Sequence, residues 1–229
     1  AGAHPTAPDR HAARPTAHLT GFAGVLQVDG YAGYRALGRS NQVHLAFCWS
    51  HVRRGFYEIA ASRPAAAEAL VRIAQLYAIE QEIRGSTPHQ RRAARQERSA
   101  PMVASLRRFL DTSLARASGK GKLAEAIRYA LNRWDGLCRF LDDGRVEIDS
   151  NIVERSIRPL ALNRKNALFA GSDQGGDHWA VIASLIETCK LNRINPQAWF
   201  SATLTRLVTG HPASALDQLM PWTSTPDVT

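Results

Sequence analysis

Cysteine is scarce in this chain of 229 residues, which has three cysteines, Cys48, Cys138 and Cys189, spaced far apart. Small secreted domains that depend on disulfides need denser cysteines, so that class is excluded, and a reducing cytoplasm fits. Long apolar runs are also missing, and none approaches the ~20 residues of a membrane-spanning helix. No apolar core follows the early charges, so the signal-peptide pattern is absent as well. We therefore expect a cytoplasmic protein that is not embedded in a membrane.

Acidic residues are in the minority. Lys and Arg number 29 against 20 Asp and Glu, which gives a formal charge of +9, while 45% of the residues are apolar. The apolar share is enough for a real core, in one domain or one domain with an insertion. The basic excess favours a polyanionic partner, most often nucleic acid. The alternative is a generic basic protein in which arginine is simply common.

The first part of the chain predicts a small α/β region. Residues 1–20 lack periodicity and are interpreted as a disordered tail or severed linker. A short apolar run at 24–28 predicts a buried strand that ends in a turn at Asp29-Gly30. A short helix is expected at 31–37, a second strand at 43–48 and a helix at 49–61. Two strands are too few for a sheet of their own.

The middle of the chain is helical in pattern. From about 64 to 141 apolar residues recur at helical spacing. Thr87-Pro88 predicts a helix start, and Pro101 predicts a restart or kink. A second helical region is expected to carry Glu154, followed by a loop at 173–177 and a helix capped by Asn195. These patterns divide the chain into segments at 21–61, 62–144 and 145–222, with a tail at 223–229.

Asp29 is the first candidate for chemistry, because it ends a predicted buried strand. Open α/β folds place their ligands at this edge of a sheet, where a carboxylate can hold a metal ion. The competing interpretation is purely structural, since aspartate also favours the first position of an Asp-Gly turn.

Glu154 is the second candidate, an acid in a run of cations. It could instead close a capping box with Asn151 and pair with Arg158 one helical turn away. Taken together, Asp29 and Glu154 could hold divalent metal ions for phosphodiester chemistry, with Mg²⁺ or Mn²⁺ as the expected ion. A complete site needs a third carboxylate, and Asp149 fits better as a helix-start residue.

Several cations could contact DNA phosphates around these acids. The candidates on the strand-bearing side are His51, Arg53 and Arg54, and those after Glu154 are Arg155, Arg158, Arg164 and Lys165. Each group could equally be a solvated basic face. The arginines within 84–98 allow the same two interpretations. A zinc site at Cys48 and His51, with His44 upstream, is conceivable but lacks a fourth ligand.

Several long motifs, in order, resemble one known family. They stand at residues 26–34, 48–56, 149–155, 164–172, 184–192, 211–212 and 219–222. The chain from about 8 to 222 resembles the large subunit of insertion-sequence-66-type transposases. The resemblance implies an RNase H-like core in an α/β, mostly helical chain, with a partial core at 21–61 and 145–222 and a helical insertion at 62–144. It also implies a DDE transposase in which Asp29 is the second catalytic aspartate and Glu154 the catalytic glutamate.

The resemblance also implies partners and an expected deficit. Mg²⁺-dependent strand cleavage and strand transfer would act on transposon ends and target DNA, at the bacterial nucleoid, within a self-associating complex. The first catalytic aspartate and the leading strands are expected upstream of this sequence, so we expect these 229 residues to be inactive alone. The alternatives are a noncatalytic basic module that binds DNA or another subunit, and a decayed transposase remnant.

Overall fold

The computed structural model describes residues 13–39, 42–151, 154, 155, 158, 162 and 172–223. The chain divides into two compact units, one within His11–Val153 and another that begins at Glu154. We call them the strand-bearing unit and the C-terminal unit, and each is described by itself. Among the described residues, no helix is long and apolar enough to cross a membrane.

The strand-bearing unit contains a two-stranded parallel sheet, β1 (Gly24–Val28) and β2 (Val43–Phe47). The register pairs Gly24 with Val43 and Val28 with Phe47, so both strands end at the same edge. The connection runs through two 3₁₀ turns, η1 (Ala32–Arg35) and η2 (Leu37–Arg39), where the sequence predicted one short helix. A short helix α1 (Ala13–His18) precedes β1. The predicted strand at 24–28 is confirmed to the residue, and the second strand ends one residue early.

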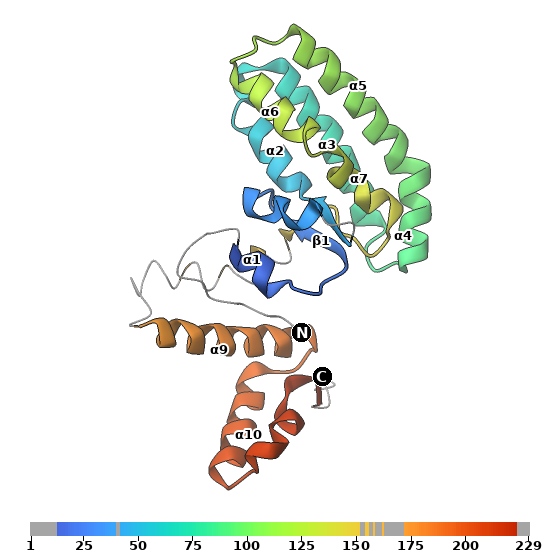
Figure 1. Ribbon diagram of the computed structural model, residues 1–229. Helices are drawn as coiled ribbons and strands as arrows, with labels where there is room; N and C mark the ends of the chain where they lie inside the picture. The colour runs from blue at the N-terminus through green and yellow to red at the C-terminus, as the bar shows by residue number, and fades with distance from the viewer. Residues whose placement is uncertain are drawn as a thin grey trace. The chain divides into compact units, whose positions relative to one another are not determined.

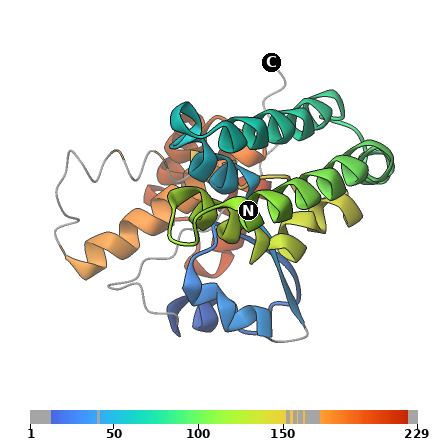
Figure 2. The same ribbon diagram turned by 90° about the horizontal axis from the view of Figure 1, so that it is seen from above.

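A bundle of helices adjoins this sheet (Figure 1). They are α2 (Trp49–Tyr57), η3 (Ala60–Ser62), α3 (Pro64–Glu82), α4 (Pro88–Ala94), a π-helical segment η4 (Arg95–Ser99), α5 (Ala100–Arg116), α6 (Lys122–Leu131) and α7 (Trp134–Asp142). The helices α3 and α5 run side by side in both views (Figures 1 and 2). The prediction of a mostly helical chain with a small α/β part is confirmed.

Local signals set several helix boundaries. The Thr87 hydroxyl accepts a hydrogen bond from the Gln90 amide at 3.3 Å. The Thr87 amide in turn donates to Oε1 of Gln90 at 3.0 Å, which completes a capping box. The π-helical segment lies just before Pro101, where the missing proline N–H interrupts the regular ladder. The predicted restart or kink at Pro101 is confirmed as a restart, because α5 begins at Ala100 after the π-helical segment.

One hydrophobic core joins the strands to the helices. Ala46, Trp49, Ile73, Leu106 and Ile127 all belong to a single buried cluster. The indole of Trp49 is fully buried and donates to the carbonyl of Leu137 at 2.9 Å. The segment predicted as a helical insertion thus shares its core with the strands, and the predicted domain boundaries remain a proposal.

The C-terminal unit contains α9 (Asp173–Leu191), α10 (Pro196–Val208) and the 3₁₀ segments η5 (Ala213–Leu219) and η6 (Pro221–Thr223). Asn195 caps α10 as predicted, accepting from the amides of Gln197 and Ala198. The predicted loop at 173–177 was wrong. Ser172 accepts from the Gly175 amide at 3.0 Å and starts α9 there, because a good N-cap outweighs two glycines in the first turn.

Candidate functional site

Asp29 lies directly after β1, in a tight turn. Its Oδ1 accepts a hydrogen bond from the Tyr31 amide at 2.9 Å, and Gly30 has a φ of +93°. The predicted Asp-Gly turn is therefore confirmed. The side chain is nevertheless exposed, so its turn role leaves the carboxylate accessible to a ligand.

Two side chains contact the backbone of this turn: Tyr129, within α6, and Arg133, just after it. The Tyr129 hydroxyl donates to the Asp29 carbonyl at 3.1 Å, and Arg133 approaches the Gly30 carbonyl at 3.5 Å. Glycine is favoured at position 30 for two reasons. Its φ is positive, and a Cβ there would lie 2.8 Å from the Tyr129 hydroxyl oxygen. Sequence reasoning missed both residues. Their spacing of four was the available signal, since the Arg133 guanidinium lies 3.9 Å from the Tyr129 ring centroid.

The negative charge of Asp29 affects two neighbouring tyrosines. Burial raises the pKa of Tyr34, and the Asp29 charge raises it further. Burial likewise raises the pKa of Tyr129, where Arg133 opposes the shift and Asp29 adds to it. Both hydroxyls therefore stay protonated at neutral pH and can donate hydrogen bonds near the carboxylate.

Cys48 follows β2 at the same edge of the sheet. The parallel register, with Val28 opposite Phe47, places Asp29 and Cys48 as the next residues on adjacent strands. Cys48 is buried, and its sulfur lies 3.3 Å from the Ser150 amide and 3.2 Å from the Ser50 hydroxyl. Burial by itself would raise the pKa of the Cys48 thiol, but hydrogen bonds from Ser150, Ser50 and His51 lower it.

Asp149 starts the segment that leads to Glu154. Its carboxylate accepts from the Asn151 amide at 3.1 Å and from the Asn151 side chain at 2.6 Å. The preceding carbonyl, of Ile148, accepts from the Trp49 amide at 3.1 Å. These bonds support the predicted helix-start role of Asp149, while much of the helix itself lies outside the described residues. Sequence reasoning missed Tyr77, whose pKa is raised by burial and by Asp149.

The cations predicted on α2 differ in environment. Arg53 and Arg54 are exposed, whereas His51 is half-buried beside Cys48. Arg54 lies 3.6 Å from Glu58, and the Arg53 guanidinium lies 5.8 Å from the centroid of the Tyr57 ring. Both arginines are thus held only by weak surface contacts, which phosphate groups could replace.

His44 is too far from Cys48 to share a zinc ion with it. That residue lies four positions before Cys48 along extended β2, or about 13 Å away at the rise of a strand. A zinc ion holds its ligands within about 2.3 Å, so His44 and Cys48 are too far apart to share one.

The remaining predicted site residues lie in or near the C-terminal unit. Glu154, Arg155 and Arg158 are helical and exposed. Arg164 and Lys165 lie outside the described residues. Because Asp29 and Glu154 belong to different units, their pairing stays a prediction.

The arginines within 84–98 are not a uniform basic face. Arg95 is fully buried and forms a bidentate pair with Glu80, and Arg91 pairs with Glu147 at 2.8 Å. The expectation of a solvated or DNA-binding face was wrong for these two residues. Their guanidinium groups are engaged inside the fold and are not available to phosphate.

The chemistry of the donors fits a hard divalent cation. Asp29 and Glu154 are both exposed carboxylates, and oxygen is the donor that Mg²⁺ and Mn²⁺ prefer.

Comparison with known proteins gives a consistent picture. A family model described as Transposase IS66 family matches residues 2–178, and one described as IS66 C-terminal element matches residues 184–222. Among curated proteins of Sinorhizobium fredii, the uncharacterized protein y4qI is 49% identical over 219 residues, and y4jD is 44% identical over 222.

The matches also set a scale for the chain. They cover 92% and 93% of this sequence but only 41% and 43% of y4qI and y4jD, so the chain spans about two fifths of their length. The uncharacterized protein YuaK of Escherichia coli is 47% identical over 38 residues, which are 17% of this chain and 40% of YuaK. No solved structure matches the chain.

Proposed function

This chain belongs to the IS66 transposase family, and from that premise we propose that it is part of the catalytic region of a DDE-type DNA transposase. The observation that carries the proposal is the position of Asp29. An exposed carboxylate follows β1 at the edge where β2 also ends, which is where a metal-binding acid of an RNase H-like core belongs.

We propose that Asp29 and Glu154 hold Mg²⁺, or Mn²⁺, together with a carboxylate from outside these 229 residues. When bound, the ions supply charge stabilisation for a phosphodiester and an activated oxygen nucleophile. Asp29 is oriented by the Tyr31 amide and, through its backbone, by Tyr129. The domain division into a core at 21–61 and 145–222 with a helical insertion at 62–144 belongs to the same proposal.

The cations have a separate task in this scheme. Arg53, Arg54, Arg155 and Arg158 are exposed on helices, and we propose that they, with His51, Arg164 and Lys165, hold DNA phosphates. The substrates would be transposon ends and target DNA, handled at the bacterial nucleoid by more than one copy of the protein. The basic excess of +9 supports a DNA partner.

The proposal is tested by metal binding and strand cleavage measured side by side. In the 229-residue chain, Mn²⁺ relaxation titrations should show weak binding that Asp29→Asn abolishes, while Asp111→Asn, an exposed acid on α5, leaves it unchanged. The chain alone should show no Mg²⁺-dependent cleavage of an element-end duplex. In a protein of the relatives' full length, Asp29→Asn and Glu154→Gln should reduce strand transfer to background.

A noncatalytic DNA-binding module is the second candidate, and the basic charge favours it. The same variants separate the two functions. If a full-length protein keeps its transposition with Asp29→Asn, the catalytic assignment is wrong, whatever the DNA affinity of the chain.

A further inference from the structure

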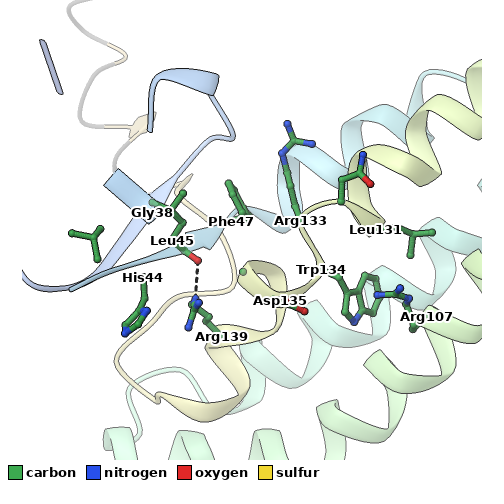
Figure 3. A pocket seen from close by; sticks show the side chains of 13 residues that line it. Gly38, His44, Leu45, Phe47, Arg107, Leu131, Arg133, Trp134, Asp135 and Arg139 are labelled. Carbon is green, nitrogen blue, oxygen red and sulfur yellow. Dashed lines mark hydrogen bonds between the residues drawn. The ribbon is translucent and has the colours of Figure 1, made fainter. Parts of the chain in front are cut away.

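A pocket of about 500 Å³ lies beside the outer edge of β2 in the strand-bearing unit. Figure 3 shows it between β2, the start of α7 and the side chain of Arg107 from α5. Of the candidate residues named from the sequence, the lining includes His44, which was considered for zinc. The lining side chains come from elements far apart in the chain, so no local motif marks the pocket.

The lining is rich in positive charge. Three arginines, Arg107, Arg133 and Arg139, face Asp135, which is the single acid among the lining residues. The exposed imidazole of His44 lies next to Arg139 on the same wall (Figure 3). Three guanidinium groups against one carboxylate give the lining an excess of positive charge, which favours an anion.

Each arginine is held in place by contacts that do not use all of its N–H donors. Arg139 donates from Nε to the Leu45 carbonyl at 2.8 Å, and its terminal nitrogens have no other partner among the described residues. Arg133 donates to the Tyr129 carbonyl at 3.1 Å and covers the Tyr129 ring. Arg107 pairs with Asp111 at 3.0 Å and lies 5.3 Å from the Trp134 ring centroid. Fixed guanidinium groups lose little entropy on binding and match phosphate geometry.

The wall between β2 and α7 is also rigid. Gly136 allows α7 to approach so closely that a Cβ there would lie 2.8 Å from the Leu45 carbonyl oxygen and 2.4 Å from the Phe47 ring. The spacing of His44 and Arg139 is therefore set by packed backbone and not by a flexible loop.

The pocket continues from the edge where Asp29 lies. Arg133 reaches the Gly30 carbonyl, directly after Asp29, and it also lines the pocket. From Phe47 back to Val43 the lining follows β2 for four residues, about 13 Å at the rise of a strand. An extended chain of anions could therefore pass from the Asp29 edge along β2.

We propose that this pocket binds backbone phosphates of the DNA strand that lies across the Asp29 edge. The path of the DNA strand in this inference rests on the proposed transposase function. The positive charge of the pocket does not depend on that function. Arg139 and Arg133 would contact the phosphates directly, since charge-assisted bonds from arginine to phosphate are among the strongest hydrogen bonds in proteins. His44 would add a further donor.

The test is fluorescence anisotropy of a labelled duplex with the 229-residue chain, in EDTA and at several salt concentrations. Arg139→Gln should weaken binding about eightfold at ~0.1 M salt and reduce the salt slope by about 0.9, the value for one phosphate contact. Arg139→Lys also loses the Nε bond to the Leu45 carbonyl, but it keeps the positive charge. This variant should therefore keep most of the affinity. Arg108→Gln, which removes an exposed charge one residue from Arg107, should leave binding near the unchanged value.

Urea unfolding of both Arg139 variants checks that they fold alike. Equal losses for Arg139→Gln and Arg108→Gln, or no loss for either, would overturn the proposal, because diffuse charge would then account for binding. Inorganic phosphate that competes as well as DNA at equal phosphate concentration would also overturn it in favour of a free anion.

Because EDTA removes divalent ions, this result does not depend on the catalytic assignment. An unaffected Arg139→Gln together with loss of strand transfer by Asp29→Asn would refute the pocket alone.

Discussion

The guanidinium of Arg95 and the carboxylate of Glu80 form two hydrogen bonds of 2.7 Å in the interior of the strand-bearing unit. Arg95 is fully buried, and Glu80 is 9% exposed. The same guanidinium donates to the carbonyls of Phe140 and Val146, at 2.8 and 2.9 Å. One buried cation thus joins α3, the π-helical segment, the end of α7 and the chain that leads to Asp149. Bidentate, charge-assisted bonds offset the cost of removing both charges from water.

Loss of Arg95 should destabilise the fold strongly. Arg95→Met leaves the buried Glu80 with only its longer, 3.5 Å contact to Arg91, and it removes hydrogen bonds from the two carbonyls. We therefore expect the free energy of unfolding to fall by about 3–5 kcal/mol. Urea unfolding followed by circular dichroism measures the change. Arg98→Met is the matched control, because Arg98 lies three residues after Arg95 and forms an exposed pair with Glu82. A similar, small effect of both substitutions would contradict the structural role of Arg95.

Gly136 should be irreplaceable in α7, whereas another helical glycine should not. At Gly136 an added Cβ meets Leu45 and Phe47 well inside contact distance, so Gly136→Ala should cost about 1–3 kcal/mol of unfolding free energy. At Gly55 in α2 the nearest atom is the Cβ of Ala126 at 3.7 Å, an ordinary contact. Gly55→Ala should stabilise the chain by about 0.5–1 kcal/mol through helix propensity. Thermal unfolding of both variants decides, and stabilisation by both would show that α7 can move away from β2.

Acid titration should detect the pair formed by Asp143 and Arg145. Hydrogen bonds from the Arg145 side chain and amide hold the pKa of Asp143 at about 2. A depressed carboxyl pKa contributes stability above about pH 4, the usual value of an unfolded aspartate, and that contribution is lost as the pH falls toward 2. NMR titration of the Asp143 carboxyl carbon should show the low pKa, and Arg145→Gln should raise it. An unchanged titration in the variant would assign the shift to other neighbours.

Tyr129 should act as a positioning residue for Asp29. Tyr129→Phe removes the hydroxyl that donates to the Asp29 carbonyl, so on the proposed function Mn²⁺ affinity should fall by about tenfold, less than for Asp29→Asn. Tyr57→Phe is the matched control, since Tyr57 is 66% exposed on α2. Equal Mn²⁺ affinities for the two phenylalanine variants would show that the turn holds its shape without the hydroxyl.

Much of the fold follows from short-range patterns. The strand at 24–28, the helix start at Thr87-Pro88, the restart at Pro101 and the Asn195 cap were all predicted, because each depends on residues within one or two turns of chain. The loop predicted at 173–177 failed for the same local reason, since the cap at Ser172 was overlooked. The exposed turn of Asp29 followed from Asp-Gly chemistry alone.

The sequence by itself determined the basic charge, the ends of the strands and the motifs that carry the family resemblance. Only the tertiary structure decided which cations are available to a ligand. Arg95 and Arg139 look alike in sequence, yet one is buried against Glu80, fifteen residues away, and the other lines a pocket against β2. The difference arises because burial and pairing depend on which distant elements pack together, and helical spacing within one segment does not record that.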